Sequence, residues 1–248
     1  MDALRRCLTK SNVLRGRDEK RQFLILGLQN AGKTTLLYRL KLGNSWKDME
    51  HDLKAMREPK LLTKDKDARS DAEPQWVVED AGYHYEETLL GGFWEVPGTP
   101  AMRQMWPSFY RAIKIHGVIF VVDGSDKSDA KEENIELAKR SLHFLMNEDE
   151  LRNAAFTVII NMRGDDHQRD RSQKSTGEDK KSLDSTDEYL HYRLGLHDLH
   201  PSCEWRFKRV TMNILRLADR ENDKKWQEIE AHIKKVLNDE RGFQMNVA

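Results

Sequence analysis

One segment near the N-terminus has the residue types and the spacing of a phosphate site. Residues 27–34 read Gly-Leu-Gln-Asn-Ala-Gly-Lys-Thr and fit the pattern G-x-x-x-x-G-K-[ST]. Its glycines let the backbone wrap closely, so that amide N–H groups point at a phosphate. In this pattern Lys33 reaches the β- and γ-phosphates and the Thr34 hydroxyl is offered to Mg²⁺. The alternative is a glycine-rich turn that binds no ligand. In that case the Lys-Thr pair would stand at these positions by chance.

The elements around this segment suit a P-loop, which needs a strand before it and a helix after it. Apolar runs predict further buried strands, at residues 22–26, 92–96, 117–122, 155–160 and 207–210. Helical spacing of apolar residues predicts helices over 32–42, over 135–146 and around 226–237. Strands that alternate with helices indicate an α/β fold with a doubly wound, mostly parallel sheet. Ligands of such sheets bind beyond the carboxyl ends of the strands, where the P-loop lies.

Composition excludes several classes of protein. The formal net charge is +0, so the total charge gives no indication of a nucleic-acid partner. No apolar run approaches the roughly 18 residues of a membrane-spanning helix. The two cysteines have no metal-ligand spacing and fit a reducing compartment. We expect an intracellular protein, most simply a cytoplasmic one.

We expect an N-terminal extension over residues 1–20 and one nucleotide-binding domain over 21–248. The extension is rich in arginine and has three possible interpretations: a weak amphipathic membrane helix, an organelle transit segment, or a terminal segment that is solvated or bound to a partner. Asp2 stands where N-myristoylation requires glycine, which excludes that lipid.

Two charged insertions interrupt the domain, at about 44–74 and 166–187. The C-terminal part of the first insertion and the whole of the second insertion are predicted to be surface loops. Within the first, Trp46, Met49, Leu53 and Met56 form one apolar stripe, which indicates a short helix. That helix either packs on its own domain or docks a partner.

Three later segments carry a resemblance to a known family. Residues 94–99 read W-E-V-P-G-T and resemble the W-D-x-G-G-Q segment of the ADP-ribosylation factor (Arf) family of small GTPases. Residues 102–106 read M-R-Q-M-W and look like that family's I-R-P-L-W, and residues 117–123 are similar to its G-L-I-F-V-V-D. The resemblance implies a Ras-like P-loop GTPase fold that binds GTP or GDP with Mg²⁺.

The resemblance implies that the phosphate site is retained. Its residues are Asn30, Ala31, Gly32, Lys33, Thr34 and Thr35, and Gly98 matches the glycine that contacts the γ-phosphate. The expected metal ligands are less regular. Glu95 replaces the family's aspartate. The preferred alignment puts Asp80 at the switch threonine, and a second alignment puts Gln75 there.

The resemblance also implies that catalysis is degraded. Thr99 stands where the family has the glutamine that orients the attacking water, and it is too short to do so in the same geometry. Pro97 replaces a flexible glycine beside it and fixes φ. No catalytic residue is therefore assigned, and we expect very slow or absent GTP hydrolysis.

The guanine motif N-K-x-D falls on residues 162–165 when counted from the preceding strand. Asp165 then accepts hydrogen bonds from guanine and Arg163 stacks on the base, but Met162 cannot replace the asparagine's hydrogen bonds to the P-loop. Met212 offers a backbone N–H to the base. Asp165 can also be one more carboxylate in an acidic loop.

An aromatic set matches the family's effector face: Tyr83, Trp94 and Phe109, with Trp106 nearby. Alternatively, these rings pack beneath the first insertion.

Two functions remain open. In one, the chain is a pseudo-GTPase, a nucleotide-bound structural or recruiting subunit of a larger assembly. In the other, it is an active, membrane-associated switch that recruits effectors in trafficking or ciliary transport. Protein partners are expected in both, through the aromatic face or the helix at Trp46–Met56. An ATP hydrolase is disfavoured by Asp165 and the Arf-type framework.

Overall fold

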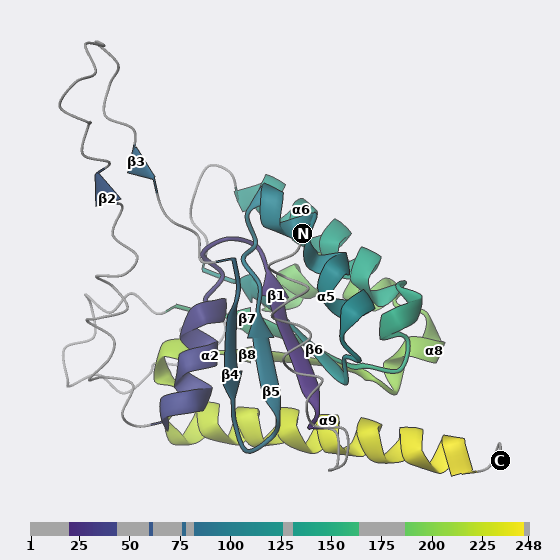
Figure 1. The fold of residues 1–248 in the computed structure, drawn as a ribbon. Helices are drawn as coiled ribbons and strands as arrows, with labels where there is room; N and C mark the ends of the chain where they lie inside the picture. Colours follow the sequence, from purple (N-terminus) through teal and green to yellow (C-terminus); the bar gives the residue numbers. More distant parts are fainter. Residues whose placement is uncertain are drawn as a thin grey trace.

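The computed structural model describes residues 20–43, 60–61, 76–77, 82–125, 131–163 and 187–245. Its centre is a six-stranded sheet in the order β4-β5-β1-β6-β7-β8 (Figure 1). The strands are β1 (Gln22–Gly27), β4 (His84–Glu87), β5 (Gly92–Glu95), β6 (Gly117–Asp123), β7 (Ala155–Asn161) and β8 (Phe207–Met212). All neighbouring pairs are parallel except β4 with β5. A separate antiparallel pair joins β2 (Lys60–Leu61) to β3 (Trp76–Val77).

Helices cover both faces of the sheet, because successive side chains of each buried strand point to opposite faces. Along β1, Leu24 and Leu26 enter one apolar cluster while Phe23 and Ile25 enter another. The first cluster is closed by α5 (Trp106–Ala112), α6 (Lys131–Met146) and a helix over 187–193. The second is closed by α2 (Lys33–Leu42) and α9 (Arg220–Met245), which runs beneath the sheet in Figure 1. The doubly wound, mostly parallel α/β fold is thereby confirmed.

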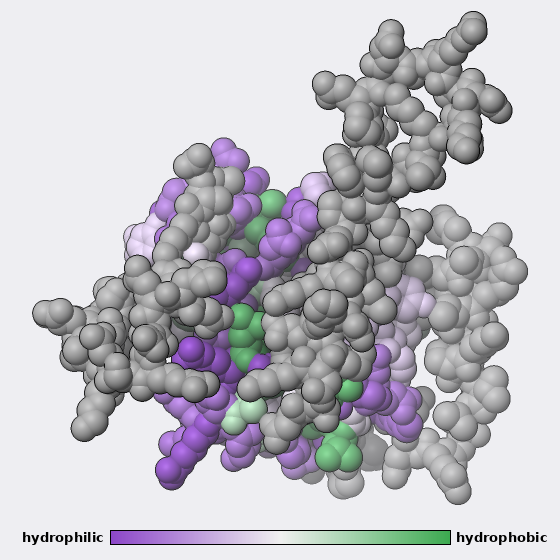
Figure 2. Space-filling model, turned by 90° about the vertical axis from the view of Figure 1, so that its left-hand side faces the viewer, coloured by the Kyte–Doolittle hydropathy of each residue, from purple (hydrophilic) through white to green (hydrophobic). Residues whose placement is uncertain are grey.

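Short elements complete the chain. They are α4 (Pro100–Arg103), α8 (Pro201–Glu204) and the 3₁₀ turns η3 (Asp149–Leu151), η4 (Leu196–Asp198) and η5 (Ile214–Arg216). The face that carries α2 and β4 is mostly hydrophilic over its described residues, with hydrophobic residues exposed at a few places only (Figure 2). No helix within the described ranges is long and apolar enough to cross a membrane.

The predicted strands and long helices lie where expected, within a few residues at their ends. Strand β4 was not predicted, because its sequence His-Tyr-Glu-Glu is polar and its position at the sheet edge needs no apolar run. The second expected loop ends at Asp187, where the helix over 187–193 begins. The N-terminal extension, the stripe from Trp46 to Met56 and most of both insertions lie outside the described residues.

Candidate functional site

The loop between β1 and α2 has a backbone that ordinary residues rarely adopt. Gly27, Asn30 and Gly32 have φ values of 139°, 60° and 103°. A side chain at residue 32 would place its Cβ only 2.5 Å from the Asn161 amide nitrogen, so position 32 requires glycine for space as well as for φ. The loop is therefore held in a wrapped form by its own sequence and by the end of β7.

The N-terminus of α2 is prepared for an anion. Gly32 is its N-cap and provides no side-chain hydrogen bond, and the first turn contains no acidic residue. The first N–H groups of a helix lack partners within the helix, and its dipole favours negative charge there. Thr34 and Thr35 lie half-buried in this first turn, so their hydroxyls are close to where an anion would bind. These features fit a nucleotide phosphate.

Lys33 lies under the loop and not on the surface. Its side chain is buried, and Nζ donates a hydrogen bond to the Leu28 carbonyl oxygen at 2.8 Å. Burial of an ammonium group is costly unless polar or anionic groups surround it. The position is that expected for a lysine that meets phosphate oxygens.

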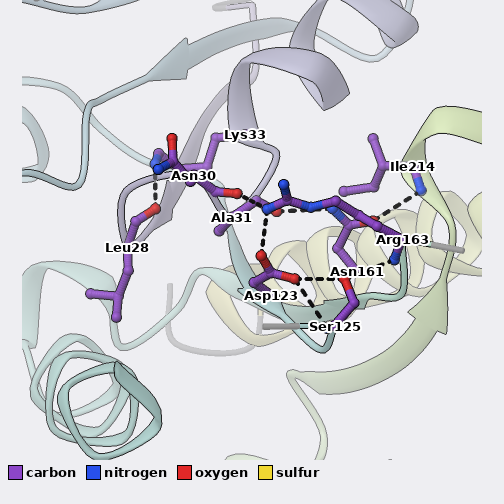
Figure 3. A network of polar contacts seen from close by, with 9 residues as sticks. All are labelled: Leu28, Asn30, Ala31, Lys33, Asp123, Ser125, Asn161, Arg163 and Ile214. Carbon is purple, nitrogen blue, oxygen red and sulfur yellow. Dashed lines mark hydrogen bonds and ion pairs between the residues drawn. The ribbon is translucent and has the colours of Figure 1, made fainter. Parts of the chain in front are cut away.

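Asn161, the last residue of β7, ties the loop to two other elements (Figure 3). Its buried amide donates from Nδ2 to the Ala31 carbonyl oxygen at 3.0 Å, and its Oδ1 accepts from the Ile214 N–H at 3.2 Å. The position expected for the motif's asparagine, residue 162, is therefore wrong by one residue, because Asn161 makes these bonds to the loop. The Met162 side chain instead packs against the first apolar cluster.

Arg163 reaches the same loop from two residues further on. Its Nη2 donates to the Asn30 carbonyl oxygen and to the Asp123 carboxylate, and its backbone N–H donates to the Ser125 hydroxyl at 3.1 Å. The Ser125 hydroxyl in turn donates to the Asp123 carboxylate at 2.9 Å (Figure 3). The ends of β6 and β7 are thus joined to the loop by one polar network, to which we refer as the clasp: Asn161, Arg163, Asp123 and Ser125.

The clasp changes which residues are assigned to the guanine motif. Asparagine and a basic residue both contact the loop, as the motif requires, but with one additional residue, Met162, between them. Sequence counting missed the roles of Asn161, Asp123 and Ser125, although Asn161 and Asp123 each follow directly on a strongly apolar run. Asp165 lies outside the described residues.

Met212 occupies the end of β8 opposite Asn161. Its side chain is buried in the second apolar cluster, and its carbonyl oxygen accepts the Met162 N–H at 2.9 Å. The Met212 side chain is therefore turned into the core, and the contact of its backbone N–H with a base stays a prediction.

Gly98 packs directly on the loop. A side chain there would bring its Cβ to 2.7 Å from the Gln29 backbone nitrogen, so only glycine allows this approach. The segment is anchored from behind: Trp106 Nε1 donates to the Pro97 carbonyl oxygen and Arg103 Nη1 to the Gly98 carbonyl oxygen, both at 3.1 Å. A phosphate held by the loop would therefore lie beside a fixed glycine.

Thr99 has a structural task. It is the N-cap of α4, and its hydroxyl oxygen accepts the Met102 N–H at 3.4 Å, while Pro100 occupies the first helical position. A hydroxyl that caps a helix is not directed at a water molecule beside the γ-phosphate.

The expected metal ligands are only partly brought together. Thr34 lies in the first turn of α2, but the buried Glu95 carboxylate is 2.7 Å from His84 Nδ1 on the neighbouring strand. Asp80 and Gln75 lie outside the described residues. Within the ranges described, no group of three or more His, Cys, Asp or Glu side chains is placed to hold a metal ion. Mg²⁺ at Thr34 would thus take its other ligands mainly from phosphate and water, which is how it commonly binds.

The aromatic set is a cluster, but it is mostly not exposed. Trp94, Trp106 and Phe109 retain 6%, 4% and 1% of their accessible surface, and only Tyr83 is half-buried. The Tyr83 ring lies 5.5 Å from both the Trp94 and the Phe109 ring centroids, and Trp94 Nε1 donates to the Gln22 side chain at 2.8 Å. The prediction that these rings form an open effector face is therefore wrong for three of the four. They belong to the core because they fill the space between β5 and α5.

A hollow of about 210 Å³ adjoins the loop. Its lining comes from residues 28–31, from the end of β6 at 121–123 and from the beginning of α6. Open space thus lies at the carboxyl ends of β1 and β6, where a doubly wound sheet binds its ligands.

Comparison with known proteins identifies a family, a relative of similar sequence and a solved structure. The model of the ADP-ribosylation factor family matches residues 8–50 and 78–191, more than half of the chain. ADP-ribosylation factor-like protein 1 of Saccharomyces cerevisiae is 31% identical over 146 residues, which are 59% of this chain and 62% of that protein. The chain therefore aligns with less than two thirds of this relative. The Arl6 (BBS3) small GTPase of Trypanosoma brucei, solved with the nucleotide analogue GppNp, has a TM-score of 0.46 and 19% identity, and covers 87% of this chain and 98% of its own.

Proposed function

Because the chain belongs to the ADP-ribosylation factor family of GTP-binding proteins, we propose that it binds GTP or GDP at residues 27–35 and hydrolyses GTP very slowly or not at all. The proposal of nucleotide binding rests on the wrapped loop. The N-terminus of α2 has no side-chain cap there, and the buried Lys33 lies beneath the loop. These groups suit a phosphate and have no comparable role in a domain without a ligand.

The proposal that GTP hydrolysis is very slow or absent is supported by Thr99. Its hydroxyl caps α4, and no glutamine side chain is present at that position to orient water. Pro97 beside it restricts the backbone of the segment that contacts the loop. Mg²⁺ would assist phosphate binding through Thr34, while Glu95 would have to leave His84 to contribute a ligand directly.

In the cell, the protein would act as a structural or recruiting subunit that retains its nucleotide. The clasp supports this function, because it joins the ends of β6 and β7 to the loop through hydrogen bonds and an ion pair. The alternative is a membrane-associated switch, which must exchange its nucleotide. The rate of exchange distinguishes the two.

The first experiment is to denature the purified protein and identify the released nucleotide by chromatography, with Lys33→Ala as the comparison. We expect about one GTP per chain in the wild type and none in the variant, because Lys33 provides a phosphate-binding ammonium. Stoichiometric GDP would contradict the slow-hydrolysis half of the proposal. An empty wild type whose thermal stability equals that of Lys33→Ala, with no stabilisation by added GTP or GDP, would contradict binding.

A further inference from the structure

A groove of about 290 Å³ runs between α5 and α6, on the opposite face of the sheet from α2 and α9. Most of its lining is apolar. The apolar and aromatic side chains are Trp106, Pro107 and Tyr110 from α5, and Leu137, Phe144 and Leu145 from α6. Phe144 keeps 58% of its accessible surface, whereas Leu137 is half-buried and Leu142 and Leu145 are buried. An aromatic ring exposed at the edge of an apolar groove is typical of an interaction surface.

The walls of the groove decide which backbone conformation can occupy it. Both walls are faces of α-helices, with side chains at steps of three and four residues. The backbone N–H and C=O groups of such walls are already paired within the helices, so they have none to offer an extended peptide. A strand in this groove would leave its own polar groups without partners. A helix satisfies its own backbone and can lay an apolar stripe between α5 and α6.

The charge of the groove decides the chemistry of that helix. The lining includes two basic residues, Arg103 and Arg140, and no carboxylate. The Arg140 side chain is 69% exposed and lies 3.8 Å from Glu136, too far for a strong ion pair. Arg103 also lines the groove, and its Nη1 donates a hydrogen bond to the Gly98 carbonyl oxygen. A guanidinium group pairs best with a carboxylate.

We propose that this groove binds an amphipathic helix of a partner protein, with large apolar residues against Phe144 and acidic residues beside Arg140 and Arg103. The lining on α6 spans residues 137–145, which corresponds to about 12 Å or two helical turns. Arg103 and Trp106 also hold the Gly98 and Pro97 carbonyl oxygens, so the groove adjoins the proposed phosphate site, but its test measures peptide binding and not nucleotide binding.

The test uses the full chain and a display library of peptides of about 12 residues, three turns of a helix-favouring sequence with a randomised face. The wild type selects the binders, and four variants locate them. Phe144→Glu and Arg140→Glu change the groove at exposed positions where folding is not at risk. Tyr192→Glu and Lys234→Glu are the matched controls: Tyr192 is an aromatic residue 66% exposed, and Lys234 is a cation on a helix surface with a glutamate four residues away, as Arg140 is.

We expect the enriched peptides to share large apolar residues three or four positions apart, with Asp or Glu beside them. Their affinity should fall about tenfold or more in Phe144→Glu and in Arg140→Glu, and should not change in either control. Enrichment of peptides without acidic residues would overturn the charge argument. Binders whose affinity is equal in all four variants, or the absence of any enrichment, would overturn the proposal.

Discussion

At the scale of single residues, Asn161 is the most informative position in the site. Its buried amide holds the Ala31 carbonyl oxygen and the Ile214 N–H together, so that the loop, β7 and η5 meet at one side chain. Met162, directly beside it, makes none of the polar contacts of the clasp. Substitution of the two neighbours separates a role in the site from a role in packing.

We predict that Asn161→Ala lowers the free energy of unfolding by about 1–3 kcal/mol, the cost of leaving buried polar groups without partners. It should also weaken GDP binding several-fold, because the loop loses a support. Urea unfolding and titration with a fluorescent GDP analogue measure the two effects.

The control is Met162→Ala, which shortens a side chain packed on the first apolar cluster and leaves the Asn161 hydrogen bonds to Ala31 and Ile214 in place. It should lower stability without weakening GDP binding. If Met162→Ala weakened GDP binding more than Asn161→Ala does, the structural assignment of the asparagine would be wrong.

At the scale of elements, the sequence predicts strands and helices correctly wherever burial determines the pattern of apolar residues. The apolar runs at 117–122 and 155–160 became β6 and β7 because a strand buried on both faces must be apolar throughout. The edge strand β4 has no such constraint and was missed. The guanine motif was misplaced by one residue for a geometric reason. Side chains alternate across a strand, so Asn161 and Arg163 both reach the loop while Met162 points to the opposite face.

The docking of α9 provides a prediction about pH. His232 lies on this helix and its Nε2 is 3.1 Å from the Arg206 carbonyl oxygen, close to Lys208 and Lys235. Burial lowers the pKa of His232 below its ordinary 6.5, and the two lysines lower it further. As the pH falls below 6.5, the unfolded chain takes up this proton before the folded chain does. Stability should therefore decrease between pH 6.5 and the folded-state pKa.

The measurement is urea unfolding at about pH 8 and about pH 5.5, on either side of the ordinary histidine pKa. His232→Gln keeps a hydrogen-bond donor and cannot titrate, so its stability should change less between the two conditions. The change should not vanish, because burial also lowers the pKa of His191. An unaltered pH dependence in His232→Gln would show that this side chain does not contribute.

At the scale of the whole molecule, the candidate site is an arrangement of strand ends. The loop after β1 converges at the carboxyl edge of the sheet with Asp123 and Asn161, the last residues of β6 and β7, and with Ser125 and Arg163, which lie two residues further on (Figure 3). The clasp restricts movement of the loop, and a nucleotide held by this loop would leave more slowly for that reason. We therefore expect slow nucleotide exchange, as a structural subunit requires and a switch does not.

Arg163→Ala tests this expectation, because it removes the side chain that joins Asn30 to Asp123. The Arg163 side chain is 39% exposed, and a partly exposed pair of this kind contributes about 1 kcal/mol, which corresponds to an exchange rate about fivefold faster. Stopped-flow release of a fluorescent GDP analogue measures the rate. Arg193→Ala is the matched control, since Arg193 binds Glu132 on the surface of another helix and should leave exchange unchanged. Rapid release from the wild type, equal in both variants, would favour a switch that exchanges freely, because the clasp would then place no barrier before the departing nucleotide.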